Sequence, residues 1–107
     1  MLTVDDDAAA RKATRALVAA TAGFVSVGEV GSGEEALEAV RELEPDLAIV
    51  DVEMPGLDGY ETSRMLMAAR PSTVVILVCT GEAAEATPKA SMTPHVLRDL
   101  WEVRSLD

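Results

Sequence analysis

Short apolar segments alternate with segments of helical spacing along most of this chain, and that alternation restricts the fold more than any other sequence feature. The apolar segments have strand length, and between them apolar residues recur at steps of three and four. Strands that alternate with helices predict a doubly wound α/β fold, in which helices cover both faces of a parallel sheet. We expect strands at residues 1–4, 24–30, 47–52 and 73–79, and helices at residues 8–22, 32–45 and 58–70.

The expected helices begin and end at residues that commonly cap helices. Asp7 is placed to cap the first helix, and the other two begin with capping boxes at Ser32 and Asp58. The expected stops are Gly23, Pro45 and Pro71. Residues 47–52 are apolar up to an acid, which is typical of a central strand that is covered on both faces.

Composition narrows the range of functions. The chain has 107 residues, which predicts a single domain over residues 1–107, and 49% of it is apolar. The net charge of -10 argues against direct binding of nucleic acid or an anionic membrane, because both are bound mainly through Lys and Arg. The single cysteine, Cys79, excludes a disulfide framework. No apolar run approaches the roughly 18 residues of a membrane span and no signal peptide is evident, so we expect a cytoplasmic protein.

Acidic residues and one hydroxyl follow three of the expected strands. Asp5 and Asp6 end the first strand, Asp51 ends the third, and Thr80 follows the fourth. Because parallel strands present their carboxyl ends at one edge of the sheet, these groups would converge. Two carboxylates about 4 Å apart repel by about 4 kcal/mol at an effective dielectric near 20, so we expect a cation between them. Carboxylate oxygens combined with bound water suit Mg²⁺.

An aspartate beside Mg²⁺ indicates phosphoryl chemistry, with Asp51 as the nucleophile and Thr80 as a hydrogen-bond donor to a phosphoryl oxygen. Each residue alone has a simpler interpretation. The acids at residues 5–7 could form a solvated turn or a helix cap, Asp51 could cap its loop, and Thr80 could be an ordinary strand-end residue. Three acids and a hydroxyl at the same ends of three strands form a less ordinary pattern.

Four motifs follow one another with a specific spacing: VDDD, GSGEEALE, PDLAIVDVEMPGLDGYE and VVILVCTGE. Through them, residues 1–82 resemble the response-regulator receiver domain of two-component signalling, in the CheY-like superfamily. The resemblance implies a flavodoxin-like (βα)5 fold with strand order 2-1-3-4-5. It implies that Asp51 is the phosphoacceptor, that Asp5 and Asp6 hold Mg²⁺ together with Asp51 and the Glu53 backbone carbonyl, and that Thr80 is the switch hydroxyl.

The spacing before Lys89 departs from the receiver pattern. Receivers have a lysine at the end of a fifth strand that contacts the phosphoryl group, and Lys89 is the candidate, only nine residues after Thr80. This segment cannot hold both a helix and a full strand, because a parallel crossover takes a dozen or so residues. We therefore expect the fourth helix and the fifth strand to be missing or truncated, and whether Lys89 reaches the phosphoryl site stays open. A last helix is expected after Thr93, with Pro94 at its first position.

Three functional hypotheses follow. The leading one is a receiver, not itself an enzyme, that takes a phosphoryl group onto Asp51 from a histidine kinase or phosphotransfer protein. Its output would be contact with an effector protein or with an output domain that this sequence lacks, and we also consider a homodimer. The second hypothesis is a degenerate receiver that binds partners without phosphorylation. The third is a phosphatase with an aspartate nucleophile, although Glu53 stands where such enzymes usually have a second aspartate.

Overall fold

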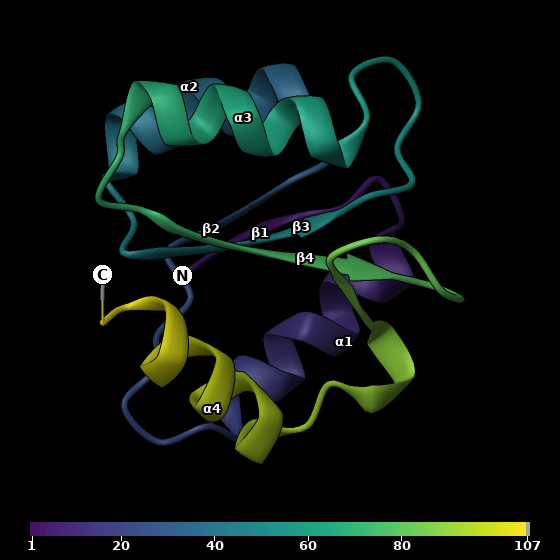
Figure 1. The fold of residues 1–107 in the computed structure, drawn as a ribbon, viewed down its shortest axis with the longest axis vertical. Coiled ribbons are helices and arrows are strands. Elements are labelled where there is room, and N and C mark those ends of the chain that lie inside the picture. Colours follow the sequence, from purple (N-terminus) through teal and green to yellow (C-terminus); the bar gives the residue numbers. More distant parts are fainter. Residues whose placement is uncertain (107) are drawn as a thin grey trace.

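A five-stranded parallel sheet forms the middle of three layers in the computed structural model, which describes residues 1–106 (Figure 1). The strand order is β2-β1-β3-β4-β5. The strands are β1 (Leu2–Val4), β2 (Gly28–Val30), β3 (Leu47–Asp51), β4 (Val74–Cys79) and β5 (Ala86–Pro88). The helices are α1 (Ala8–Ala19), α2 (Gly33–Leu43), α3 (Gly59–Ala69) and α4 (Pro94–Arg104), and a 3-10 turn, η1 (Lys89–Ser91), precedes α4.

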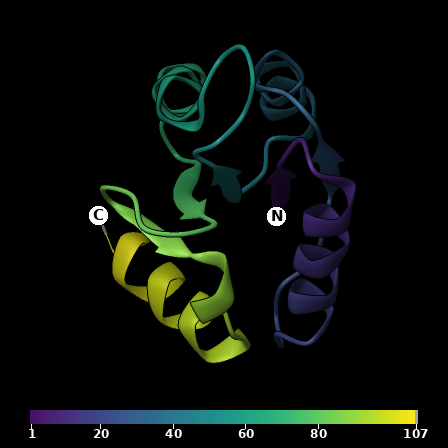
Figure 2. The same cartoon turned by 90° about the vertical axis from the view of Figure 1, so that its right-hand side faces the viewer.

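The helices cover the two faces of the sheet in pairs. Helices α2 and α3 lie on one face, and α1 and α4 lie on the other (Figures 1 and 2). Alternate residues of the central strand β3 point into the two cores, so that Val50 belongs to the first and Ile49 to the second. All five residues of β3 are buried, as expected for a central strand in a doubly wound fold. The structure confirms the predicted fold class and strand order.

The predicted helix caps are present. Asp7 accepts a hydrogen bond from the Ala9 N–H at the start of α1. Asp58 accepts one from the Glu61 N–H at 2.9 Å, so that α3 begins directly after the loop at residues 52–58. Ser32 caps α2 in the same way, and its hydroxyl also donates to the Glu35 carboxylate at 3.2 Å. These caps determine where each helix begins relative to the strand before it.

Two predicted elements are three or more residues shorter at one end than the sequence pattern indicated, whereas the other predicted bounds lie within two residues of those observed. The strand predicted at residues 24–30 is regular only at Gly28–Val30, because β1 offers partners only from Leu2 onward. The preceding residues are held by single bonds, from the Met1 ammonium to the Val25 carbonyl and from the Val27 N–H to the Met1 carbonyl. Helix α1 ends at Ala19, before the predicted end at residue 22. Alternation and helical spacing therefore overestimated the length of both elements.

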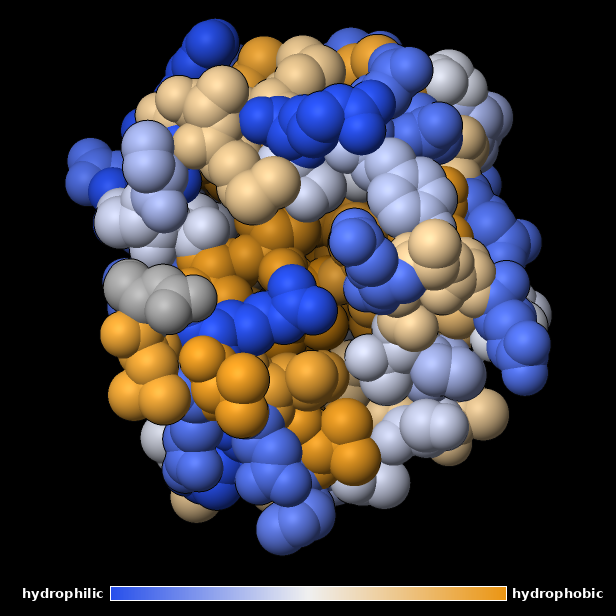
Figure 3. Space-filling view, in the orientation of Figure 1, coloured by the Kyte–Doolittle hydropathy of each residue, from blue (hydrophilic) through white to orange (hydrophobic). Residues whose placement is uncertain are grey.

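The connection between β4 and β5 contains no helix and has only six residues, 80–85. Leu77 pairs with Ala86 and Cys79 pairs with Pro88, so the chain retreats by only two residues before it runs parallel to β4. Two residues of strand span about 7 Å, a distance that six residues cover easily. The expected absence of a helix and truncation of the fifth strand are confirmed. On the face that Figure 3 shows, apolar residues gather between α3 and α4, over β4.

No helix within residues 1–106 is both long enough and apolar enough to cross a membrane.

Candidate functional site at the carboxyl ends of the strands

The acidic residues at the ends of β1 and β3 lie side by side. Val4 pairs with Val50 in the parallel sheet, so Asp5 and Asp51 follow at the same level of neighbouring strands. One carboxylate oxygen from each of Asp5, Asp6 and Asp51 lies within 4.8 Å of the others. Asp5 and Asp51 are each only 3% exposed, whereas Asp6 is exposed to solvent. The cluster therefore has two buried carboxylates and a third at its mouth.

Backbone groups hold one oxygen of each buried carboxylate. The Asp7 N–H donates to Asp5 Oδ1 at 3.0 Å, and the Glu53 N–H donates to Asp51 Oδ1 at 3.1 Å. Both bonds span two residues and are typical of an aspartate that opens a turn. They orient each side chain so that its second oxygen, Oδ2, is free for another partner.

That partner is Lys89, which follows β5 directly. Its Nζ lies 2.8 Å from Asp5 Oδ2 and 3.3 Å from Asp51 Oδ2. The ammonium thus bridges the ends of two strands from a third segment of the chain. The sequence left open whether Lys89 could reach this site, and the structure places it there because even the truncated β5 delivers its carboxyl end to the same edge of the sheet.

Burial and charge change the ionisation of these groups. Burial raises the pKa of Asp51, and the nearby Asp5 charge adds to that effect; the Glu53 N–H and the Lys89 ammonium oppose it. Burial alone would lower the pKa of Lys89, but hydrogen bonds and charges from Asp5 and Asp51 outweigh that effect and raise it. Lys89 is therefore held as an ammonium by the carboxylates around it.

Two predicted site residues lie at this edge without joining the ion pairs. Thr80 comes immediately after β4 and is exposed, and no hydrogen bond from its hydroxyl to the acids is present in residues 1–106. Glu53 is exposed as well, and its contact with the cluster is made by its backbone N–H. The structure therefore brings Asp5, Asp6, Asp51 and Lys89 together and leaves Thr80 and Glu53 at the rim.

Two residues outside the predicted set of site residues help to build the site. The Arg11 guanidinium donates to the Asp5 backbone carbonyl at 2.8 Å, which ties α1 to the end of β1. Gly59 lies so close to the end of β3 that a Cβ there would be 2.2 Å from the Asp51 carbonyl oxygen. The capping box at Asp58 predicted the start of this helix, and the fold shows that its first residue, Gly59, rests on the backbone of Asp51.

The cluster fits a divalent cation. Its donors are carboxylate oxygens, which Mg²⁺ prefers, and one of them is on the exposed Asp6 where bound water can complete the coordination. Within the described residues, Lys89 is the only residue that forms an ion pair with any of these three carboxylates. This excess of negative charge is a physical reason for a metal ion to bind here.

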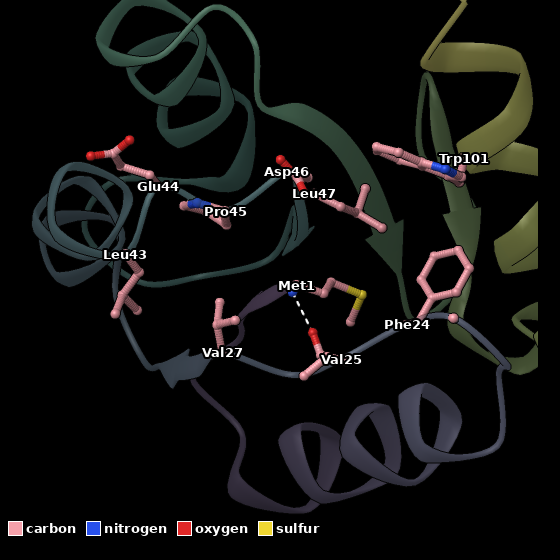
Figure 4. Close-up of a pocket in the computed structure, with 11 residues that line it drawn as sticks. Met1, Phe24, Val25, Val27, Leu43, Glu44, Pro45, Asp46, Leu47 and Trp101 are labelled. Atoms are coloured by element: carbon pink, nitrogen blue, oxygen red, sulfur yellow. Dashed lines mark hydrogen bonds between the residues drawn. The ribbon is translucent and has the colours of Figure 1, made fainter.

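A separate cavity lies at the amino ends of the strands (Figure 4). It has a volume of about 320 Å³ and lies between Met1 and Val27 on one side and Leu47 on the other, with Trp101 near one end. None of the acidic cluster residues lines it. A smaller cavity of about 100 Å³ lies beside Lys89, between α1 and η1.

Comparison with known proteins identifies the class. The family model of the response regulator receiver domain matches residues 1–97, and the chain belongs to this family. Receiver domains are the parts of two-component response regulators that interact with histidine kinases or phosphotransfer proteins.

Individual relatives agree with this assignment. The chain is 44% identical over 91 residues to a protein-glutamate methylesterase/protein-glutamine glutaminase of Symbiobacterium thermophilum, covering 84% of this chain and 25% of that protein. It is 40% identical over 78 residues to the response regulator GacA of Pseudomonas viridiflava, covering 73% and 36% respectively. The response regulator domain of Thermotoga maritima CheB has the same fold, with a TM-score of 0.81, 26% identity, and coverage of 99% of this chain and 96% of that one.

This chain spans about a quarter to a third of the length of these curated relatives. The methylesterase name describes that whole protein, of which this chain covers 25%.

Proposed function

We propose that this chain is a phosphoacceptor receiver in which Asp51 takes a phosphoryl group from a histidine kinase or phosphotransfer protein. One observation supports this most: a buried carboxylate, Asp51, stands between two further acids and an ammonium that come from other segments of the chain. A carboxylate used only for packing or capping has no need of such neighbours. We propose that the chain is not itself an enzyme for a separate substrate.

In the proposed reaction, an oxygen of Asp51 forms a bond to phosphorus while the bond between phosphorus and the donor breaks. The donor keeps the electron pair of the broken bond, and the product is an aspartyl phosphate. Lys89 would exchange its contact with the Asp51 carboxylate for one with a phosphoryl oxygen. The Thr80 hydroxyl, at the rim, would donate a hydrogen bond to another.

Asp5, Asp6 and Asp51, together with the Glu53 backbone carbonyl, would hold Mg²⁺. Bound there, the ion would offset the negative charge of the transferred group. The output would be a change in contact with an effector protein, with a further domain or with a second copy of the chain.

Acetyl phosphate with Mg²⁺ tests the proposal, with the intact mass of the protein as the readout. Wild-type protein should gain one phosphate, and Asp51→Asn should gain none. Asp58→Asn is a matched control, because it makes the same acid-to-amide change in the same loop and Asn still caps α3. Equal labelling of wild type and Asp51→Asn would contradict the assignment of the acceptor.

A second function, that of an interaction module independent of phosphorylation, is favoured by the missing helix between β4 and β5. This loss alters one side of the molecule while leaving the acidic cluster intact. Wild-type protein that takes up no phosphate, binds Mg²⁺ weakly and still binds a partner would support this second function over the first.

A further inference from the structure

The connector between β4 and β5, residues 80–85, supports two of the groups proposed to surround the phosphoryl site. Thr80 is its first residue, and its last residue leads directly into β5 and then Lys89. Because β5 has only three residues, its position depends on the connector more than that of a longer strand would. The positions of Thr80 and Lys89 relative to Asp51 therefore depend on the conformation of the connector.

Few backbone bonds hold this connector. A single turn bond runs from the Ala86 N–H to the Ala83 carbonyl at 3.2 Å, and the Cys79 thiol contacts the Gly81 carbonyl at 3.2 Å. Glu85 has a φ of 60°, in the left-handed region that is unfavourable for a residue with a side chain. A segment with these features would readily adopt other conformations if nothing else fixed it.

Tyr60, in the first turn of α3, supplies the missing support. Its hydroxyl donates a hydrogen bond to the Ala84 carbonyl at 2.7 Å, across 24 residues of sequence. Its ring packs on the same core cluster as Ala83 and Ala86. Within residues 1–106 this is the only side-chain hydrogen bond that joins the connector to a distant element.

The position of Tyr60 is itself tied to Asp51. The residue before it, Gly59, donates a backbone hydrogen bond to the Val52 carbonyl at 3.2 Å and lies in contact with the Asp51 backbone. A short path of contacts thus runs from Asp51 through Gly59 and Tyr60 to Ala84. It ends on the segment that carries Thr80 at one end and Lys89 beyond the other.

We infer that Tyr60 is a positioning residue for phosphoryl acceptance. Its hydroxyl holds the connector so that Thr80 and Lys89 stand around Asp51 when the phosphoryl group arrives. The inference rests on the proposed function. It assigns to Tyr60 an effect on the rate of phosphorylation without any weakening of Mg²⁺ binding. The acidic residues proposed to hold the ion lie outside the connector, and a displaced Lys89 would only leave their charge uncompensated.

The test compares Tyr60→Phe with Thr73→Val. The Phe variant keeps the ring and loses only the hydroxyl bond to Ala84. Thr73→Val removes a buried hydroxyl bond of equal length, 2.7 Å, from Thr73 to the Pro45 carbonyl, before β4 begins. Both variants lose one side-chain hydrogen bond, so the second controls for general loss of stability.

Two measurements are made on both variants and on wild type. The first is the rate of labelling by acetyl phosphate at saturating Mg²⁺, together with the Mg²⁺ concentration at half-saturation. Tyr60→Phe should be labelled more slowly by about three- to tenfold, the range expected for one hydrogen bond, with a Mg²⁺ half-saturation concentration that does not rise. The second is amide hydrogen exchange, which should rise in residues 80–89 of Tyr60→Phe only.

Thr73→Val should label at the wild-type rate. If wild type is labelled normally and the two variants have equal rates, the role of Tyr60 is overturned while the proposed function stands. If wild type takes up no phosphate at all, the proposed function itself fails. A slower Tyr60→Phe whose Mg²⁺ half-saturation concentration rises in parallel would also overturn the inference, because the metal site would then be the cause.

Discussion

The Lys89 ammonium donates a hydrogen bond to Oδ2 of Asp51 at 3.3 Å, across 38 residues of sequence. The same nitrogen lies 2.8 Å from Asp5 Oδ2. In the absence of a metal ion, this one cation compensates two buried carboxylates that would otherwise repel each other. Lys89 and Mg²⁺ therefore meet the same requirement for positive charge, and the ionisable groups of the site are coupled to one another.

Replacing Lys89 by Met should destabilise the metal-free protein by roughly 1–3 kcal/mol, because two buried carboxylates lose a hydrogen-bonding partner and their counter-charge. The raised pKa of Lys89 means that its stabilising contribution is complete below the ordinary lysine pKa of 10.5 and is lost as the pH rises through the raised value. Thermal unfolding in EDTA at pH 7 measures the loss. Lys12→Met, on the exposed side of α1, is the matched control and should unfold like wild type. Equal midpoints for the two variants would contradict the compensating role.

Asp51→Asn should raise the metal-free stability at pH 7. The pKa of Asp51 is raised, chiefly by burial, so the folded state holds a proton there more tightly than the unfolded state does. The charged carboxylate consequently costs stability above the raised pKa, and that cost disappears as the pH falls through it. The free energy of unfolding of the variant should therefore exceed that of wild type at pH 7, and the difference should disappear in acid. Denaturant unfolding in EDTA across this pH range measures the difference. A difference that grows in acid would contradict a raised pKa of Asp51.

Asp6→Asn should weaken Mg²⁺ binding with little effect on the metal-free protein, because Asp6 is the exposed member of the cluster. Wild type should be stabilised by about 2.7 kcal/mol when Mg²⁺ is present at a hundredfold excess over its dissociation constant. Asp6→Asn should lose most of that gain at the same concentration. Asp7→Asn makes the same change one residue later and leaves an N-cap in place, so it should keep the gain. Loss of the gain in both variants would indicate a general charge effect.

Gly59→Ala should destabilise the fold by more than about 2 kcal/mol, because the new Cβ would lie 2.2 Å from the Asp51 carbonyl oxygen and 2.5 Å from the Val52 Cα. These are backbone atoms at the end of β3, and they cannot move away without displacing Asp51. Gly81→Ala is the comparison, since no atom lies within 4 Å of its added Cβ. Chemical denaturation of both variants measures the difference. A Gly59→Ala protein as stable as Gly81→Ala would show that the loop and α3 separate at little cost.

Most of the site could be predicted from local sequence, and the reason lies in the geometry of parallel sheets. The apolar run at residues 47–52 ends in Asp51, and the β1 segment ends in Asp5 and Asp6. Once both are strands of one parallel sheet, their carboxyl ends share an edge. Capping residues such as Asp58 then place the following helix. These features depend on spacing along the chain, so the sequence contains them directly.

Only the tertiary structure decided the length of β2, the position of Lys89 and the contact between Tyr60 and Ala84. Residues 24–27 alternate like a strand, yet β1 is too short to pair with all of them. Strand β5 has three residues and no apolar pattern. It forms because its residues pair with the last three residues of β4, from Leu77 to Cys79. The alternation and the acids determined the fold class and the acidic cluster. The register between distant segments decided what surrounds Asp51, because hydrogen bonds between strands and across 24 or 38 residues leave no local pattern in the sequence.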